Sequence, residues 1–176
     1  PGLRAGINLS MHNLHDFKLM MRIEEALSKN GLGAASLLLE ITETGVMLDP
    51  DQVIEILEQL AAMGLKLSID DFGTGHSSLV HLRRLPVHTL KVDKSFVIDM
   101  DSDEENASIV RATIDLAHSL GLTVTAEGVE TRTVHDLLKG MRCDYYQGYY
   151  VGKPMTLPEV ELWLGNGEAG LHDAAR

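Results

Sequence analysis

Two adjacent aspartates before a glycine-rich loop are the strongest chemical signal in this sequence. Residues 67–79 read LSIDDFGTGHSSL, so an apolar run leads to Asp70 and Asp71, then to a Gly-x-Gly loop and two serines that can cap a helix. This order is typical of a strand that delivers acidic groups to the rim of a parallel α/β structure. Neighbouring carboxylates stay ionised together only when a cation or solvent screens them. The pair therefore indicates either a divalent metal site or a solvated turn before a helix.

Short apolar runs alternate with longer amphipathic segments along the whole chain. The predicted strands cover residues 6–9, 36–41, 67–69, 89–93, 123–126 and 145–151. The segments between them carry apolar residues at helical spacing. About six strand and helix units follow one another without a hairpin signal, which predicts parallel strands covered by helices. The sequence therefore predicts an α/β fold.

Capping signals mark several of the predicted helix boundaries. Asp49, Pro50 and Gln52 are typical of a helix that begins with proline at its first position. Residues 102–105 read SDEE, which has the spacing of a capping box, and Gly121 is a suitable helix end.

Polar groups at the downstream ends of the predicted strands distinguish between two α/β architectures. These residues are Asn8, Glu40, Asp70, Asp71, Lys91, Glu127 and Gln147. A (β/α) barrel gathers its site from the ends of many strands, whereas an open doubly wound sheet usually has a glycine-rich phosphate loop after its first strand. No such loop follows the first predicted strand. We therefore predict an incomplete TIM-type (β/α) barrel with about six of eight strand and helix units.

The acidic residues of this set suggest hard metal ions. Glu40, Asp70, Asp71 and Glu127 form a ligand set that is rich in oxygen and contains no histidine, which favours Mg²⁺ or Mn²⁺ over Zn²⁺. Two hard cations beside several carboxylates suggest phosphoryl chemistry, in which metals activate water and stabilise the leaving oxygen.

Composition and charge limit the possible partners and surroundings. The 176 residues are 44% hydrophobic and carry a formal net charge of −11. An acidic chain lacks the basic face that a nucleic-acid polymer or an anionic membrane requires. Cys143 has no partner for an internal disulfide, and no apolar run reaches the length of a membrane span. These features predict a cytoplasmic, reducing compartment.

An ordered set of short motifs spans most of the chain. The motifs are NLS at residues 8–10, EITE at 40–43, DDFGTGHSSL at 70–79, LP at 85–86 with LKVD at 90–93, AEGVET at 126–131 and QGYY at 147–150. In this order and spacing they resemble the motifs of EAL-domain cyclic di-GMP phosphodiesterases. The resemblance covers residues 8–154.

The resemblance implies a role for each matching residue. The implied metal ligands are Asn8, Glu40, Asp70, Asp71 and Glu127. Glu127 would also be linked to the water nucleophile, Lys91 would hold or polarise that water near the phosphate, and Gln147 would complete the site. Glu43 would brace the loop after Asp71 without contacting a metal, and Glu130 would be a second acidic support.

One part of the family pattern is missing. The Glu-Ala-Leu signature of such domains precedes the Asn-Leu-Ser strand, and no equivalent lies upstream of Asn8. We therefore expect residues 1–164 to be the last six strands of an eight-stranded barrel, with exposed apolar interior surface, and residues 165–176 to be a frayed tail. Such a piece would form a homodimer or associate with the missing N-terminal part of the domain.

Two functional hypotheses follow from the resemblance. The first is hydrolysis of cyclic di-GMP to linear pGpG with two Mg²⁺ or Mn²⁺ ions. The second is a catalytically degenerate domain that serves as a cyclic di-GMP receptor or a protein-interaction module. Degenerate receptors are expected to lose acidic ligands, and the acids that can be looked for in this sequence are present.

Overall fold

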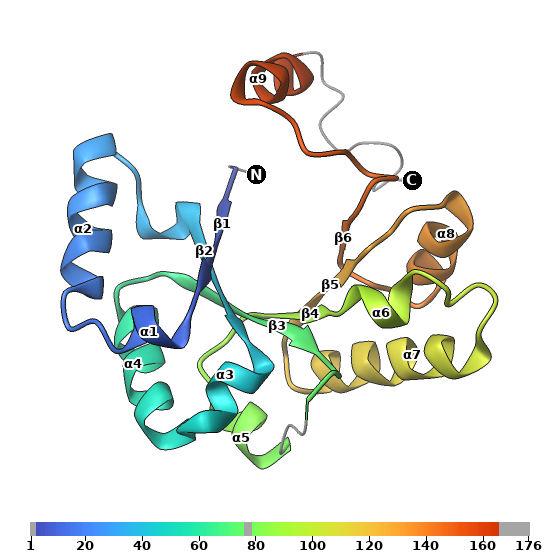
Figure 1. The fold of residues 1–176 in the computed structure, drawn as a ribbon, viewed down its shortest axis with the longest axis horizontal. Coiled ribbons are helices and arrows are strands. Elements are labelled where there is room, and N and C mark those ends of the chain that lie inside the picture. The colour runs from blue at the N-terminus through green and yellow to red at the C-terminus, as the bar shows by residue number, and fades with distance from the viewer. Residues whose placement is uncertain (1–2, 76–78, 166–176) are drawn as a thin grey trace.

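Six parallel strands form one curved sheet in chain order (Figure 1). The computed structural model describes residues 3–75 and 79–165. The strands are β1 (Ala5–Leu9), β2 (Leu37–Thr42), β3 (Lys66–Phe72), β4 (Thr89–Val92), β5 (Thr123–Glu127) and β6 (Tyr145–Gln147). All five neighbouring pairs are parallel, and β1 and β6 form the two edges. The predicted α/β class is confirmed, and the sheet is a half-barrel that is consistent with an incomplete TIM-type barrel.

The helices between successive strands lie on the convex side of the sheet, and one more helix follows the last strand (Figure 1). They are α1 (Met11–Leu14), α2 (Leu19–Asn30), the short 3₁₀ helix η1 (Ala34–Ser36), α3 (Glu43–Leu48), α4 (Pro50–Ala62), α5 (Leu79–Arg84), α6 (Lys94–Val97), α7 (Glu104–Ser119), α8 (Arg132–Gly140) and α9 (Leu157–Gly165). None of these described helices is both long enough and apolar enough to cross a membrane. Residues 166–176 of the predicted tail lie outside the described residues.

The capping predictions succeed at one helix and shift by one residue at another. The Asp49 side chain accepts a hydrogen bond from the Gln52 amide, and Pro50 begins α4 as predicted. At α7 the cap is Asp103 and not the first residue of the SDEE motif, because the Asp103 carboxylate accepts bonds from the amides of Glu105 and Asn106. An ionised carboxylate at this position also stabilises the positive end of the helix dipole.

The last strand is shorter than predicted. It ends at Gln147, whereas the sequence suggested that it extends to Val151. The chain turns at Gly148, whose carbonyl accepts hydrogen bonds from the amides of Val151 and Gly152. A Cβ atom at Gly148 would lie 2.3 Å from the backbone of Val129, so only glycine allows this close approach of two loops.

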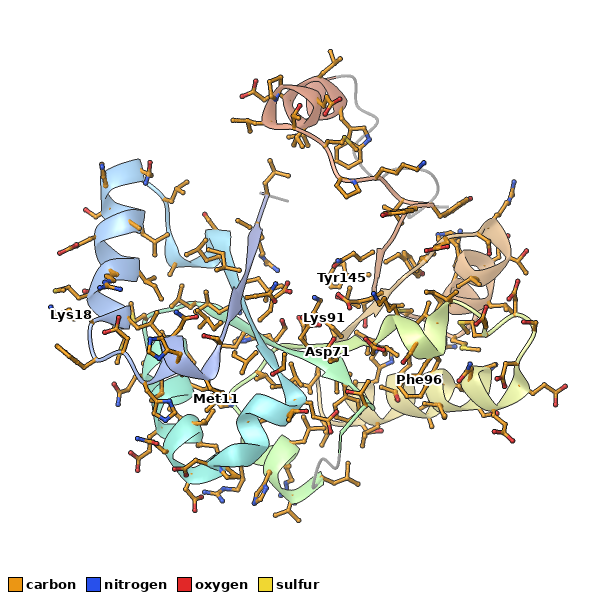
Figure 2. The ribbon with its side chains drawn as sticks, viewed as in Figure 1. Met11, Lys18, Asp71, Lys91, Phe96 and Tyr145 are labelled. Atoms are coloured by element: carbon orange, nitrogen blue, oxygen red, sulfur yellow. The ribbon has the colours of Figure 1, made fainter. Side chains whose placement is uncertain are left out.

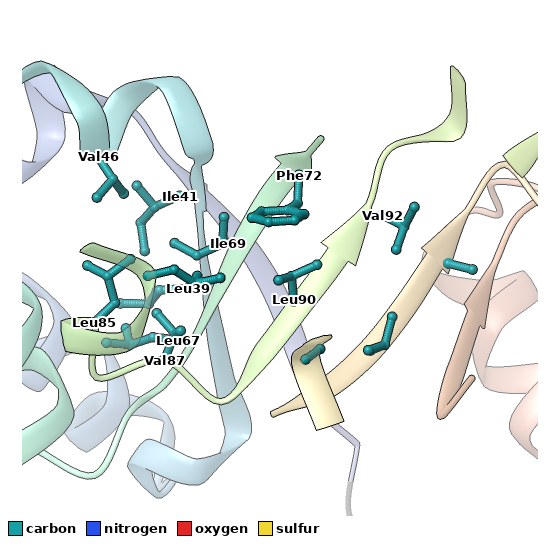
Figure 3. Close-up of a cluster of buried hydrophobic side chains, with 14 of the residues drawn as sticks. Leu39, Ile41, Val46, Leu67, Ile69, Phe72, Leu85, Val87, Leu90 and Val92 are labelled. Atoms are coloured by element: carbon teal, nitrogen blue, oxygen red, sulfur yellow. The ribbon is translucent and has the colours of Figure 1, made fainter. Parts of the chain in front are cut away.

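The hydrophobic core lies between the sheet and the helices (Figure 3). Side chains from alternate positions of the central strands are almost completely buried there: Leu39, Ile41, Leu67, Ile69, Leu90 and Val92. Because successive side chains of a strand point to opposite faces, the residues between them line the inside of the half-barrel.

The inner face of the half-barrel is polar. Ser68, Thr89 and Lys91 are buried on this face, and the Thr89 and Thr123 hydroxyl oxygens lie 2.9 Å apart. The expectation of an apolar interior surface is therefore wrong for these central strands. The Thr89 and Thr123 hydroxyl groups pair with each other, whereas the buried Ser68 hydroxyl has no hydrogen-bond partner among the described residues.

Cys143 provides a test of the packing below β6. Its side chain is 6% exposed, and burial raises the pKa of its thiol to about 11. At pH 8 a thiol of that pKa is ionised in only about one molecule in a thousand, so thiol–disulfide exchange in the native protein should be at least about a hundredfold slower than in urea. A disulfide-exchange reagent such as DTNB measures both rates. Equal rates in the folded and unfolded protein would contradict this packing.

Candidate active site

Lys91 lies at the centre of a group of carboxylates on the inner face of the half-barrel (Figure 2). Its Nζ atom is 2.6 Å from Glu40 Oε2, 2.6 Å from Glu127 Oε1 and 3.1 Å from Asp70 Oδ1. Lys91 extends from β4, and the three acids come from β2, β5 and β3. These four residues, which we call the Lys91 cluster, join four strands at one rim of the sheet.

The electrostatics of the Lys91 cluster are dominated by surplus negative charge. The lysine side chain is 4% exposed, and the three acidic side chains are 13% to 15% exposed. Burial alone would lower the pKa of Lys91, but hydrogen bonds to Glu127 and Glu40 and the nearby negative charges hold that pKa above its ordinary value. Burial raises the pKa of Glu127, and the charges of Asp70 and Glu40 add to the rise against the effect of Lys91. One ammonium group therefore does not neutralise the three acids.

A second grouping of carboxylates overlaps with the Lys91 cluster. Oxygen atoms of Asp70, Asp71 and Glu127 all lie within 4.8 Å of one another. Burial and the neighbouring charges of Asp70 and Asp93 raise the pKa of Asp71. Oxygen donors with excess negative charge are the ligands that Mg²⁺ and Mn²⁺ prefer, so these residues fit a hard divalent cation.

Asp93 is a member of the site that the sequence did not single out. Its carboxylate forms a hydrogen bond with the Asp71 carboxyl group and caps α6 by accepting a bond from the Ser95 amide at 2.9 Å. Burial opposes ionisation, but the bonds from Ser95 and Asp71 hold the pKa of Asp93 below its ordinary value. The sequence feature that could have identified Asp93 is its position two residues after Lys91, where the same strand ends.

Glu43 holds the loop that follows the aspartate pair. It is 2% exposed at the start of α3, and its Oε2 atom accepts a hydrogen bond of 2.8 Å from the Gly73 amide. A Cβ atom at Gly75 would lie 2.8 Å from Glu43 Oε1, so the absence of a side chain there lets the loop pass close to the carboxylate. Just before this loop, Asp71 lies in the left-handed region, with φ of 56°. The Thr42 hydroxyl caps the short helix that begins at Glu43.

Three other predicted site residues are exposed and do not belong to the Lys91 cluster. Asn8 is exposed on β1 and pairs in register with Glu40, and Gln147 is exposed on β6 and pairs with Glu127. Both therefore lie on the strands that flank the Lys91 cluster. Glu130 is exposed, and within the described part of the chain it forms no hydrogen bond or ion pair with the cluster.

Comparisons with known proteins connect this geometry to one family. The EAL domain family model matches residues 1–154. The cyclic di-GMP phosphodiesterase NbdA of Pseudomonas aeruginosa is 43% identical over 162 residues, which are 92% of this chain and 21% of that protein. The chain thus spans about a fifth of the length of the curated relatives it matches.

Solved structures show the same similarity. The PaMucR phosphodiesterase in its c-di-GMP complex is 40% identical, with a TM-score of 0.86 over 89% of this chain and 64% of that chain. Klebsiella pneumoniae BlrP1 in complex with manganese and cy-diGMP is 34% identical, with a TM-score of 0.80 over 86% of this chain and 39% of that chain.

Replacing Glu43 with alanine tests its hold on the loop. A hydrogen bond to a charged group contributes about 1.5 to 3 kcal/mol, so the free energy of unfolding should fall by about that amount in Glu43→Ala. Urea denaturation measures the change, with Glu58→Ala on the exposed side of α4 as the control. A loss no larger than that of the control, which should stay within about 0.5 kcal/mol, would show that Glu43 does not support the loop.

Proposed function

The chain belongs to the EAL domain family, and from that premise we propose that it hydrolyses cyclic di-GMP to linear pGpG with two divalent cations, Mg²⁺ or Mn²⁺. The observation that carries this proposal is the overlap of two groups, the Lys91 cluster and the oxygens of Asp70, Asp71 and Glu127 within 4.8 Å. Acids from separate strands meet around one ammonium group, and their surplus negative charge calls for cations.

We assign cation binding to the acidic side chains of the inner rim, with the amide of Asn8 as a further ligand. The acids are Glu40, Asp70, Asp71 and Glu127. When bound, the cations would supply an activated water and neutralise charge on the phosphate. Asp93 would support this group of acids, because its carboxylate forms a hydrogen bond with the Asp71 carboxyl group.

Lys91, Glu127 and Gln147 carry the proposed chemistry of this chain's own residues. The Glu127 carboxylate would accept a proton as water attacks phosphorus and one ester oxygen leaves, which opens the cyclic dinucleotide. Lys91 lies 2.6 Å from that carboxylate, where its fixed positive charge would hold the water and stabilise charge on the phosphate. Gln147 pairs in register with Glu127 and would donate to the substrate or water at the edge of the site. Glu43 would hold the loop after Asp71, and Glu130, which is exposed, would be a second acidic support.

Chelation and one conservative substitution test the proposed reaction. The protein that carries this chain should release pGpG from cyclic di-GMP in the presence of Mg²⁺ or Mn²⁺ and stop in EDTA. Glu127→Gln preserves shape but removes the base, so kcat should fall at least about a hundredfold while the protein remains folded. Chromatography of the products measures both effects.

Two results would contradict the hydrolase proposal. Undiminished turnover after thorough chelation would exclude the metal site, and a near-normal rate in Glu127→Gln would make that residue structural. Tight binding of cyclic di-GMP without any product would instead support the degenerate receptor.

We also propose that strands from outside this chain complete the barrel. Four of the five residues of β1 are exposed, and β1 and β6 pair with no second neighbour within residues 3–75 and 79–165. Unpaired strand edges are templates for further pairing. The partner is either a second copy or the N-terminal part of an EAL domain, in a cytoplasmic and reducing compartment.

Sedimentation of residues 1–176 tests this completion. Alone, the chain should self-associate or precipitate and turn over cyclic di-GMP negligibly, because no Glu-Ala-Leu segment with its metal ligand lies upstream of Asn8. Supplying that segment of the domain in trans should produce a defined complex with higher activity. A stable monomer with full activity would contradict the proposal.

A further inference from the structure

The one-turn helix α6 lies between the loops that follow the acids of β3 and β5. It follows β4, the strand of Lys91, and it is fixed at its start by the Asp93 cap and at its end by Val97, which is fully buried. Contacts join α6 to α7 and to β5. The helix is therefore anchored to the core by Val97 and to the site by Asp93, whose carboxylate also bonds to Asp71.

One side of α6 contacts the loop of the aspartate pair. A Cβ atom at Gly73 would lie 3.0 Å from Phe96 Cε2, so the aromatic ring packs directly on the backbone at Gly73. Gly73 has φ of 102°, and its amide donates the hydrogen bond that the Glu43 carboxylate accepts. Figure 2 shows Phe96 and Asp71 on the neighbouring segments. The loop is thus held between the Glu43 carboxylate and the Phe96 ring.

The other side of α6 contacts the loop that follows Glu127. Gly128 has φ of 73°, and a Cβ atom there would lie 2.7 Å from the Cβ of Lys94 and 3.1 Å from Ile98 Cγ1. The backbone beside Glu127 is therefore packed directly against α6 and the residue that ends it. An added Cβ atom would be tight against Phe96 at Gly73 and would collide with Lys94 at Gly128, and both glycines have a positive φ.

We propose that α6 is a spacer that sets the separation between the acids of β3 and the acid of β5. Phe96 and Lys94 are positioning residues, because they act on Asp71 and Glu127 through their contacts with Gly73 and Gly128. A shift of either loop changes the 4.8 Å grouping of Asp70, Asp71 and Glu127. This inference rests on the proposed function only in that the grouped acids bind a cation.

Truncation of Phe96 is the first test. Loss of a residue that orients metal ligands lowers metal affinity about 10-fold to 100-fold, so Phe96→Ala should raise the Kd for Mn²⁺ at least about tenfold in calorimetric titration, and Phe96→Leu should restore part of the affinity. Ile114→Ala is the control, because it truncates a fully buried side chain of α7 that lies outside α6 and both loops. The control should lower stability and leave the Kd within about twofold.

Filling the gap at Gly128 is the second test. Gly128→Ala adds a methyl group where Lys94 and Ile98 leave no room, and it should weaken Mn²⁺ binding as Phe96→Ala does. Gly121→Ala is the matched control, since Gly121 has a similar φ of 75° but no atom within 4 Å of the added Cβ. The two variants share the backbone strain, and only the first displaces α6.

Hydrogen exchange separates failure of the spacer from failure of the metal site. In metal-free protein, exchange of the Gly73 amide should be faster in Phe96→Ala than in Ile114→Ala at equal global stability. If wild-type protein does not bind Mn²⁺, the proposed metal site is wrong, and this exchange rate alone decides on the spacer. Unchanged Gly73 exchange, or Mn²⁺ affinity within twofold of wild type in both Phe96→Ala and Gly128→Ala, would overturn the inference.

Discussion

A single buried ammonium group shared by three carboxylates is the interaction on which the rest of this structure depends. Lys91 and its partners lose hydration when they leave water, and only short hydrogen bonds in a fixed geometry compensate for that loss. Removing Lys91 would leave three partly buried acids to repel one another. The rim can therefore persist only because four strands place these groups within hydrogen-bonding distance.

The outer face of the sheet stabilises the fold, and the inner face carries the candidate site. The outer face is apolar and packs under helices, and so it fixes the register of the strands. That register determines which side chains meet on the inner face, where Glu40, Asp70 and Glu127 converge on Lys91. The short helices α3 and α6 then hold the loops that follow these strands. Precision at the site thus comes from core packing and from backbone contacts that allow no side chain.

Much of this arrangement follows from patterns in the sequence, and the exceptions have physical reasons. The alternation of apolar and amphipathic runs predicts the parallel sheet, and strand-end acids predict a charged rim. Helices α3 and α6 are too short to show helical periodicity. The early end of β6 depends on the close approach of Gly148 to Val129, and the polar interior depends on hydroxyl pairs such as that of Thr89, which only the register reveals. Such long-range contacts leave no local signature.

The most direct test of the account is a crystal structure of the protein that carries this chain, grown with Mn²⁺ and measured at the manganese absorption edge. We expect anomalous density between the carboxylates of Asp70, Asp71 and Glu127, with Lys91 still within hydrogen-bonding distance of an acid of the rim. Manganese bound elsewhere, or no density at these residues at saturating Mn²⁺, would contradict the central claim that this rim is a cation site.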